Sequence, residues 1–185
     1  MRAFVAVRAP PIDGLAPLLL SPGSGRHLTL RFLGEIQEGQ VGILGSALDQ
    51  ALASFPPFDL QLGGIGAFPS AQHPRVVWAG VTLGSSETVA LAQQVESTLA
   101  PLGIPGEARP FVPHVTLFRI RTPTDRRRAE TLLTSAAEVN SPTLRVTYVL
   151  LQKSTLTRNG AIHETLHRSP LGASDASSGS DPKND

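Results

Sequence analysis

The arrangement of apolar and polar positions along the chain predicts alternating strands and helices. Apolar residues spaced three or four positions apart predict helices over 40–55, 86–102 and 124–139, with a shorter one within 10–19. Alternating or continuously apolar runs predict strands at 3–7, 27–33, 58–62, 75–83, 111–119 and 144–152. Asn159–Gly160 is typical of a tight hairpin turn, so 161–166 is expected to return antiparallel. The Gly-rich segment 63–69 is expected to be a connection.

This order of elements predicts an α+β fold built from two similar halves. The same short motif occurs at His27 and at His114, about half of the ordered chain apart, and an internal duplication is the economical explanation. Residues 1–171 are expected to form a single domain, because this length buries enough apolar surface for one core. The small polar residues of 172–185 predict a disordered C-terminal tail.

The motif pairs a histidine with a threonine two positions later. Residues 27–30 read His-Leu-Thr-Leu and residues 114–117 read His-Val-Thr-Leu. In a strand, residues i and i+2 share one face, so each imidazole is expected beside a hydroxyl while the apolar residues pack on the other side. Histidine can give or take a proton near neutral pH, and threonine can donate to a phosphate oxygen. Two such pairs facing each other suit acid–base opening of a cyclic phosphodiester, which requires no metal.

The composition narrows the chemistry further. The 185 residues include no cysteine, which excludes disulfides, thiolate metal sites and cysteine nucleophiles. The net charge of +1 gives no strong overall field, so contacts with nucleic acid must be local. Arg8 and Pro10–Pro11 interrupt the apolar N-terminus, and no apolar run approaches the ~20 residues that span a membrane. We therefore expect a cytoplasmic protein without membrane partners.

Two longer segments around the motifs resemble a known family. HLTLRFLGE (27–35) and FVPHVTLFR (111–119) are similar to the paired signatures of the 2H phosphoesterase superfamily, and more closely to its RNA 2′,3′-cyclic phosphodiesterases, also called 2′-5′ RNA ligases. MRAFVAV (1–7), HPRVVWAGV (73–81) and LLQKSTLTRNGAIHETL (150–166) resemble the opening strand, central strand and final hairpin of that family. The chain departs from the family at Phe118, where small residues are common, and in the loop 21–25.

The resemblance implies a bilobal fold in which two pseudo-twofold-related antiparallel sheets line a central groove and helices lie outside. It implies hydrolysis of RNA 2′,3′-cyclic phosphate ends to a 2′-phosphate without a metal. We also expect no cofactor, and a monomer, because nothing in the sequence demands a larger assembly. His27 and His114 correspond to the catalytic histidines, and Thr29 and Thr116 to the phosphate-binding threonines. By analogy, His27 protonates the leaving 3′ oxygen and His114 activates water. Family members can also join tRNA halves reversibly through a 2′-5′ bond, and a nucleotide is a further candidate occupant of the groove.

Several side chains leave two interpretations open. Arg119 points away from Thr116 in an unbroken strand, where it would form an edge salt bridge, but a bulge would turn it toward a phosphate. Arginines 121 and 126–128 form either a solvated helix face or an RNA-binding rim. Phe4 and Trp78 fit core packing or base stacking.

His163-Glu-Thr-Leu-His167 matches the HExxH zinc pattern, which requires a helix. The hairpin predicted here would instead place the two histidines on one strand face. Three hypotheses therefore stand: a metal-free phosphodiesterase, an RNA- or nucleotide-binding module that uses the His-x-Thr pairs only to hold phosphate, and a zinc hydrolase.

Overall fold

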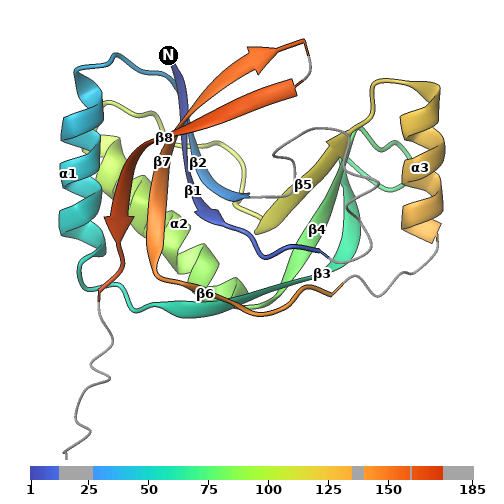
Figure 1. Ribbon diagram of the computed structural model, residues 1–185, viewed down its shortest axis with the longest axis horizontal. Coiled ribbons are helices and arrows are strands. Elements are labelled where there is room, and N and C mark those ends of the chain that lie inside the picture. Colours follow the sequence, from blue (N-terminus) through green and yellow to red (C-terminus); the bar gives the residue numbers. More distant parts are fainter. Residues whose placement is uncertain (13–26, 135–139, 159, 173–185) are drawn as a thin grey trace, which may run out of the picture.

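The chain folds into two four-stranded antiparallel sheets with helices on the outside (Figure 1). The computed structural model describes residues 1–12, 27–134, 140–158 and 160–172. The first sheet has the order β2-β1-β7-β8, formed by His27–Glu35, Arg2–Arg8, Tyr148–Thr157 and Gly160–Pro170. The second sheet has the order β5-β4-β3-β6, formed by His114–Arg119, Val76–Leu83, Phe58–Phe68 and Leu144–Val146. The predicted α+β architecture is confirmed.

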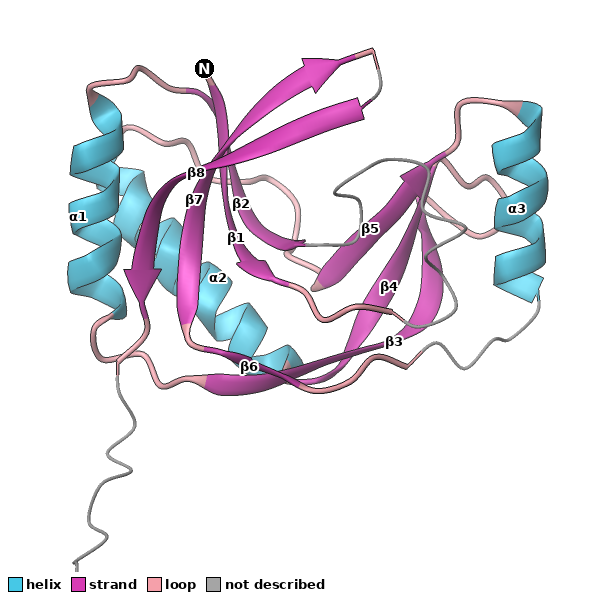
Figure 2. Ribbon diagram, in the orientation of Figure 1, coloured by secondary structure: helices cyan, strands magenta, loops and turns pink. Residues whose placement is uncertain are grey.

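Helices α1 (Gln40–Leu52) and α2 (Ser85–Leu99) pack against each other and cover the first sheet, as Figure 2 shows. Helix α2 continues into a short 3-10 helix, Ala100–Leu102. Leu44, Leu48 and Leu52 recur every fourth residue along α1 and are buried, as expected for an amphipathic helix. None of the described helices has the length and apolar character required to cross a membrane.

Helix α3 (Pro123–Thr134) contacts β3 of the second sheet. It begins with a reciprocal cap: the Asp125 amide donates to the Thr122 hydroxyl, and the Asp125 carboxylate accepts from the amides of Arg121 and Thr122. These hydrogen bonds satisfy donors that the first turn of a helix leaves unpaired, and so define where α3 starts.

The two sheets exchange strands between the halves of the chain. Strand β3 follows α1 but pairs with β4 in the second sheet, and β7 returns from the second half to pair with β1 in the first. Strands β1, β2 and β7 thus correspond to β4, β5 and β3. The duplication predicted from the two motifs is therefore present, but neither sheet consists of one half of the sequence.

One hydrophobic core joins the elements from Ala3 to Leu171. Leu28 and Leu30 of β2 and Val115 and Leu117 of β5 are buried in it. These are the apolar members of the two motifs, so core packing fixes the face on which each motif histidine stands.

Two predictions about element boundaries were wrong. Residues 63–68 continue β3 instead of forming a connection, because their backbone pairs with β4 and the bulge at Gly64 absorbs an extra residue. The single strand expected over 144–152 is two strands, β6 and β7, which lie in different sheets. The helix expected within 10–19 and the tail predicted beyond Gly172 fall largely outside the described residues, so those two expectations stay predictions.

Candidate functional site

The two motif histidines occupy equivalent places in the two sheets. His27 is the first residue of β2 and His114 the first residue of β5. Both strands lie at the edge of their sheets, and β2 and β5 contact each other in the centre of the molecule (Figure 1). The fold therefore brings together the two strands that carry the predicted site.

Both strands carry a β-bulge at the same place in the motif. In the pairing of β1 with β2, Val5 opposes Arg31 and Ala6 opposes Thr29, which leaves Leu30 without a partner position. In the pairing of β4 with β5, Val77 opposes Phe118 and Trp78 opposes Thr116, which leaves out Leu117 in the same way. The local backbone irregularity is thus duplicated together with the sequence.

The bulge determines which side chains share the face of the motif histidine, here termed the histidine face. Paired residues in an antiparallel ladder project to the same side of the sheet. The histidine face of the second sheet carries, in opposed pairs, His114 and Gly80, Thr116 and Trp78, and Arg119 and Val76. On the first sheet the corresponding pairs are His27 and Arg8, Thr29 and Ala6, and Phe32 and Phe4.

Arg119 therefore lies on the same side of the sheet as His114 and Thr116, and its side chain is exposed. The sequence left two arrangements open for Arg119, and the structure shows the one in which a bulge turns its side chain to the face of the motif histidine. Phe118, the departure from the family pattern, is 3% exposed and packs in the core. In the first sheet the same bulge buries Arg31, whose guanidinium lies 3.7 Å from Glu96 and 3.6 Å from Glu107.

His27 packs in a cluster of three rings. Its ring centroid lies 5.0 Å from that of Phe4 and 4.8 Å from that of His163, and the two imidazole planes are nearly perpendicular. The Phe4 and His163 centroids are 5.0 Å apart, which closes the triangle. Burial, and to a smaller extent the neighbouring His163, lowers the pKa of His27 to about 4. His27 is thus a neutral imidazole at neutral pH.

His114 stands in a second aromatic cluster. Its ring centroid lies 5.0 Å from that of Phe68 and 6.1 Å from that of Trp78. Its Nδ1 is 2.7 Å from the Val112 carbonyl oxygen, which can only accept, so Nδ1 carries the proton. Nε2 is left as the nitrogen that can exchange a proton with a substrate. The sequence alone left open whether Phe4 and Trp78 pack in the core or stack on a base. In the structure, the Phe4 ring contacts His27 and the Trp78 ring contacts His114.

His163 is the member of the site that sequence reasoning missed, because it was considered only as part of HExxH. The prediction that His163 and His167 share one face was wrong. A bulge at Leu166 in the pairing of β7 with β8 places them on opposite sides of β8. His163 contacts His27, whereas Nε2 of His167 contacts the Asp49 carboxylate of α1 at 2.9 Å. The two histidines cannot bind one zinc ion together in this arrangement.

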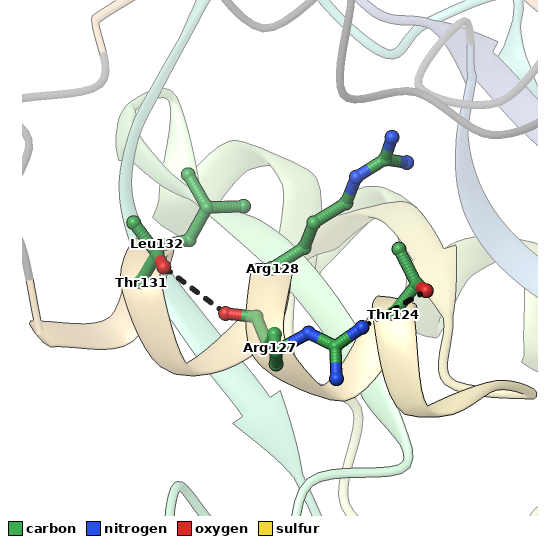
Figure 3. Close-up of a pocket in the computed structure, with 5 residues that line it drawn as sticks. All are labelled: Thr124, Arg127, Arg128, Thr131 and Leu132. Atoms are coloured by element: carbon green, nitrogen blue, oxygen red, sulfur yellow. Dashed lines mark hydrogen bonds between the residues drawn. The ribbon is translucent and has the colours of Figure 1, made fainter.

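Two surface hollows lie outside these ring clusters. A pocket of about 310 Å³ lies along α3, where Arg127 donates to Thr124 at 3.4 Å (Figure 3). Arg127 is exposed at this pocket and Arg128 is half-buried. A second pocket, of about 120 Å³, is lined by Arg8, which pairs with His27 across the strands, and by Leu144–Tyr148.

Among the described residues, no group of three or more His, Asp or Glu side chains is arranged to hold a metal ion.

Comparison with known proteins places these features in a family. Residues 22–155 match the model of the 2′-5′ RNA ligase superfamily. The chain is 38% identical over 141 residues to a protein of Aeropyrum pernix named RNA 2′,3′-cyclic phosphodiesterase, covering 76% of this chain and 79% of the relative. It is 36% identical over 147 residues to a protein of the same name from Aquifex aeolicus, covering 79% of this chain and 78% of the relative.

Solved structures show the same fold. The protein TT0787 of Thermus thermophilus superposes with a TM-score of 0.72 at 26% identity, covering 92% of this chain and 98% of that one. Escherichia coli LigT, solved in complex with 3′-AMP, superposes with a TM-score of 0.66 at 26% identity, covering 92% of this chain and 97% of that one. The resemblance stated from the motifs is confirmed.

Proposed function

This chain belongs to the 2′-5′ RNA ligase superfamily, and from that premise we propose that it hydrolyses RNA ends carrying a 2′,3′-cyclic phosphate to a 2′-phosphate. The observation that carries the proposal is the equivalence of the two motif strands. Both are edge strands, both begin with the histidine, both have the same bulge, and they contact each other. The names of the relatives from Aeropyrum pernix and Aquifex aeolicus support the substrate class.

In this proposal His27 and His114 carry out the two proton transfers. Hydrolysis of a cyclic phosphodiester removes a proton from the attacking water and adds one to the departing sugar oxygen, and two imidazoles suffice for both steps without a metal. The hydroxyls of Thr29 and Thr116 share the histidine faces and donate to the non-bridging phosphate oxygens, where charge accumulates in the transition state. Arg119, on the face of His114, binds the same phosphate or its neighbour in the RNA chain.

We propose that the same site also runs in reverse and joins two RNA ends through a 2′-5′ bond, with tRNA halves as candidate substrates. A nucleotide is a candidate occupant because LigT, a structural neighbour of this chain, has been solved with NADP⁺ as well as with 3′-AMP. The monomer is proposed as the active species because the two motif strands come from one chain.

The direct test is turnover of an oligonucleotide ending in 2′,3′-cyclic phosphate, in the presence of EDTA. His27→Gln and His114→Gln should each lower kcat/KM by about 10²–10⁴-fold. His73→Gln is the matched control, because His73 is exposed and lies outside both ring clusters. Binding without turnover would support the phosphate-holding module instead, and activity lost with EDTA and dependent on His163 would support a zinc hydrolase.

The role of the arginines is tested by salt dependence. Arg119→Gln should weaken RNA binding and reduce the slope of log affinity against log salt concentration by about one. Arg127→Gln, on the exposed face of α3, should leave that slope unchanged. An equal effect of both substitutions would favour the RNA-binding rim on α3 and contradict the specific role given to Arg119.

A further inference from the structure

The edge of the site beside His27 carries a cation that has no counterpart beside His114. Arg8 is the last residue of β1 and opposes His27, so the two side chains project to the same face of the first sheet. At the equivalent place in the second sheet, Gly80 of β4 opposes His114. The two halves of the site share the histidine, the threonine and the bulge, but they differ in charge at this pair of positions.

Arg8 is exposed and has no acidic partner. It belongs to none of the ion pairs that join described residues. Its side chain lines the pocket of about 120 Å³ together with Leu144–Tyr148, a volume several times the roughly 30 Å³ that one water molecule occupies in the liquid. The planar guanidinium of an arginine matches the oxygens of a phosphate. The pocket at Arg8 therefore suits a small anion.

Two more arginines stand around this pocket. Arg145 of β6 also lines it and pairs with Asp59 at 3.2 Å. The guanidinium of Arg168, from β8, lies 3.5 Å from the ring centroid of Tyr148, another lining residue. Three arginines and one paired carboxylate leave this part of the described structure with a net positive charge. We term Arg8, Arg145 and Arg168 the basic corner.

The register of the first sheet connects the basic corner to the motif. Ala6 opposes Thr29 of β2 on one side and Leu150 of β7 on the other. Leu150 in turn opposes Arg168 of β8. Because paired residues project to the same side of a sheet, the face that carries Thr29 continues across three strands to Arg168. The motif side chains and the arginines of this sheet therefore share one surface, with Arg8 next to the motif histidine.

The proposed substrate is asymmetric in the same sense as the site. An RNA end that carries a 2′,3′-cyclic phosphate continues only through the 5′ oxygen of its last ribose. The next phosphate of the strand therefore lies to one side of the reacting phosphorus, and it carries a negative charge of its own. Arg8 offers an unpaired cation beside His27, whereas Gly80 offers no side chain beside His114.

We propose that Arg8 binds the phosphate that links the last two nucleotides of the RNA, so that this protein distinguishes RNA ends from free 2′,3′-cyclic mononucleotides. This inference rests on the proposed function. The cyclic phosphate lies at the motif histidines, and the linking phosphate lies in the pocket at Arg8. Arg145 and Arg168 attract the preceding part of the strand to the same side. Arg8 acts on substrate choice and takes no part in proton transfer.

The first test compares two substrates in two proteins. A dinucleotide ending in 2′,3′-cyclic phosphate contains the linking phosphate, and its methylphosphonate analogue keeps the shape of that link without its charge. In the wild type, kcat/KM should be about fivefold to twentyfold higher for the phosphate than for the methylphosphonate. In Arg8→Gln the two substrates should react with similar kcat/KM. The same preference in Arg8→Gln as in the wild type would overturn the proposal.

Two further variants separate a specific contact from a general effect of charge. Arg2→Gln is the matched control, because Arg2 is exposed on the same strand but opposes Glu35 at the end far from His27. It should keep the wild-type preference for the phosphate. Arg8→Lys should keep part of it, because a cation remains without the planar fork. Equal losses in Arg2→Gln and Arg8→Gln would contradict the assignment to Arg8.

A binding measurement separates this inference from the proposed function. The product, a dinucleotide ending in 2′-phosphate, can be titrated into the full-length protein by calorimetry without turnover. Arg8→Gln should weaken its binding and reduce the slope of log affinity against log salt concentration by about 0.7. Absence of turnover in the wild type would refute the proposed function. Unchanged product affinity and salt slope in Arg8→Gln would refute the role of Arg8, whether or not the wild type is active.

Discussion

Gly66 is the position where one added methyl group should disturb both the fold and the site. It lies in β3 opposite Trp78 of β4, so the two residues project to the same side. A Cβ at position 66 would overlap the Cζ2, Cη2 and Cε2 atoms of the indole. The indole cannot simply move aside, because it packs against Phe68 at 5.3 Å and His114 at 6.1 Å between ring centroids.

The magnitude follows from the overlap. Inserting a methyl group into a packed region costs about 1–3 kcal/mol, and a chain of this size loses about 2–4 °C of Tm per kcal/mol. Gly66→Ala should therefore lower the Tm by about 2–12 °C. If the indole pushes the His114 ring by about 1 Å, kcat/KM on the cyclic phosphate substrate should fall by up to about 10²-fold.

Calorimetry, tryptophan fluorescence and kinetics together decide this prediction. Trp78 is the single tryptophan of the chain, so its emission reports the displaced ring directly. Gly42→Ala is the matched control, because a Cβ there meets nothing within 4 Å and replacing a helical glycine by alanine stabilises by up to about 1 kcal/mol. Combining Gly66→Ala with Trp78→Phe should recover part of the stability. A Gly66→Ala protein with unchanged Tm, emission and kcat/KM would refute the idea that Trp78 is confined against His114.

Three further predictions concern stability. Leu28→Ala should lower the free energy of unfolding in urea by about 2–5 kcal/mol, because Leu28 is fully buried; a loss below about 1 kcal/mol would contradict its place in the core. Thr122→Ala removes the hydroxyl that accepts from the Asp125 amide at the start of α3, and should lower the free energy of unfolding by about 1 kcal/mol in thermal unfolding. An unchanged free energy of unfolding would contradict this, because it would mean that water replaces the cap. The pKa of His27 is about 4 in the folded protein and 6.5 in the unfolded chain. Between pH 6.5 and pH 4 the His27 imidazole therefore takes up a proton in the unfolded chain but not in the folded protein, so the free energy of unfolding falls as the pH falls. From pH 7 to pH 5 this amounts to about 1–2 kcal/mol, which His27→Gln should abolish; equal losses in both proteins would show that His27 titrates normally.

The sequence alone determined the features that depend on local periodicity. Alternation along a strand places His27 with Thr29 and His114 with Thr116, since side chains two positions apart share a face whatever the partner strand is. The helical spacing of apolar residues predicted α1 and α2 to within a few residues. The repeated motif indicated the duplication, and its similarity to a known family indicated the fold.

The tertiary structure decided everything that depends on which strand pairs with which. A bulge exists only relative to a partner strand. The sequence therefore could not decide on which face of β5 Arg119 lies, and it could not show that His163 and His167 lie on opposite faces of β8. The strand that runs from Leu144 divides between two sheets because β6 and β7 have different partners. The contact between His163 and His27 joins residues far apart in the chain across the width of a sheet. Local pattern carries no information about such a contact, because packing of the whole sheet creates it.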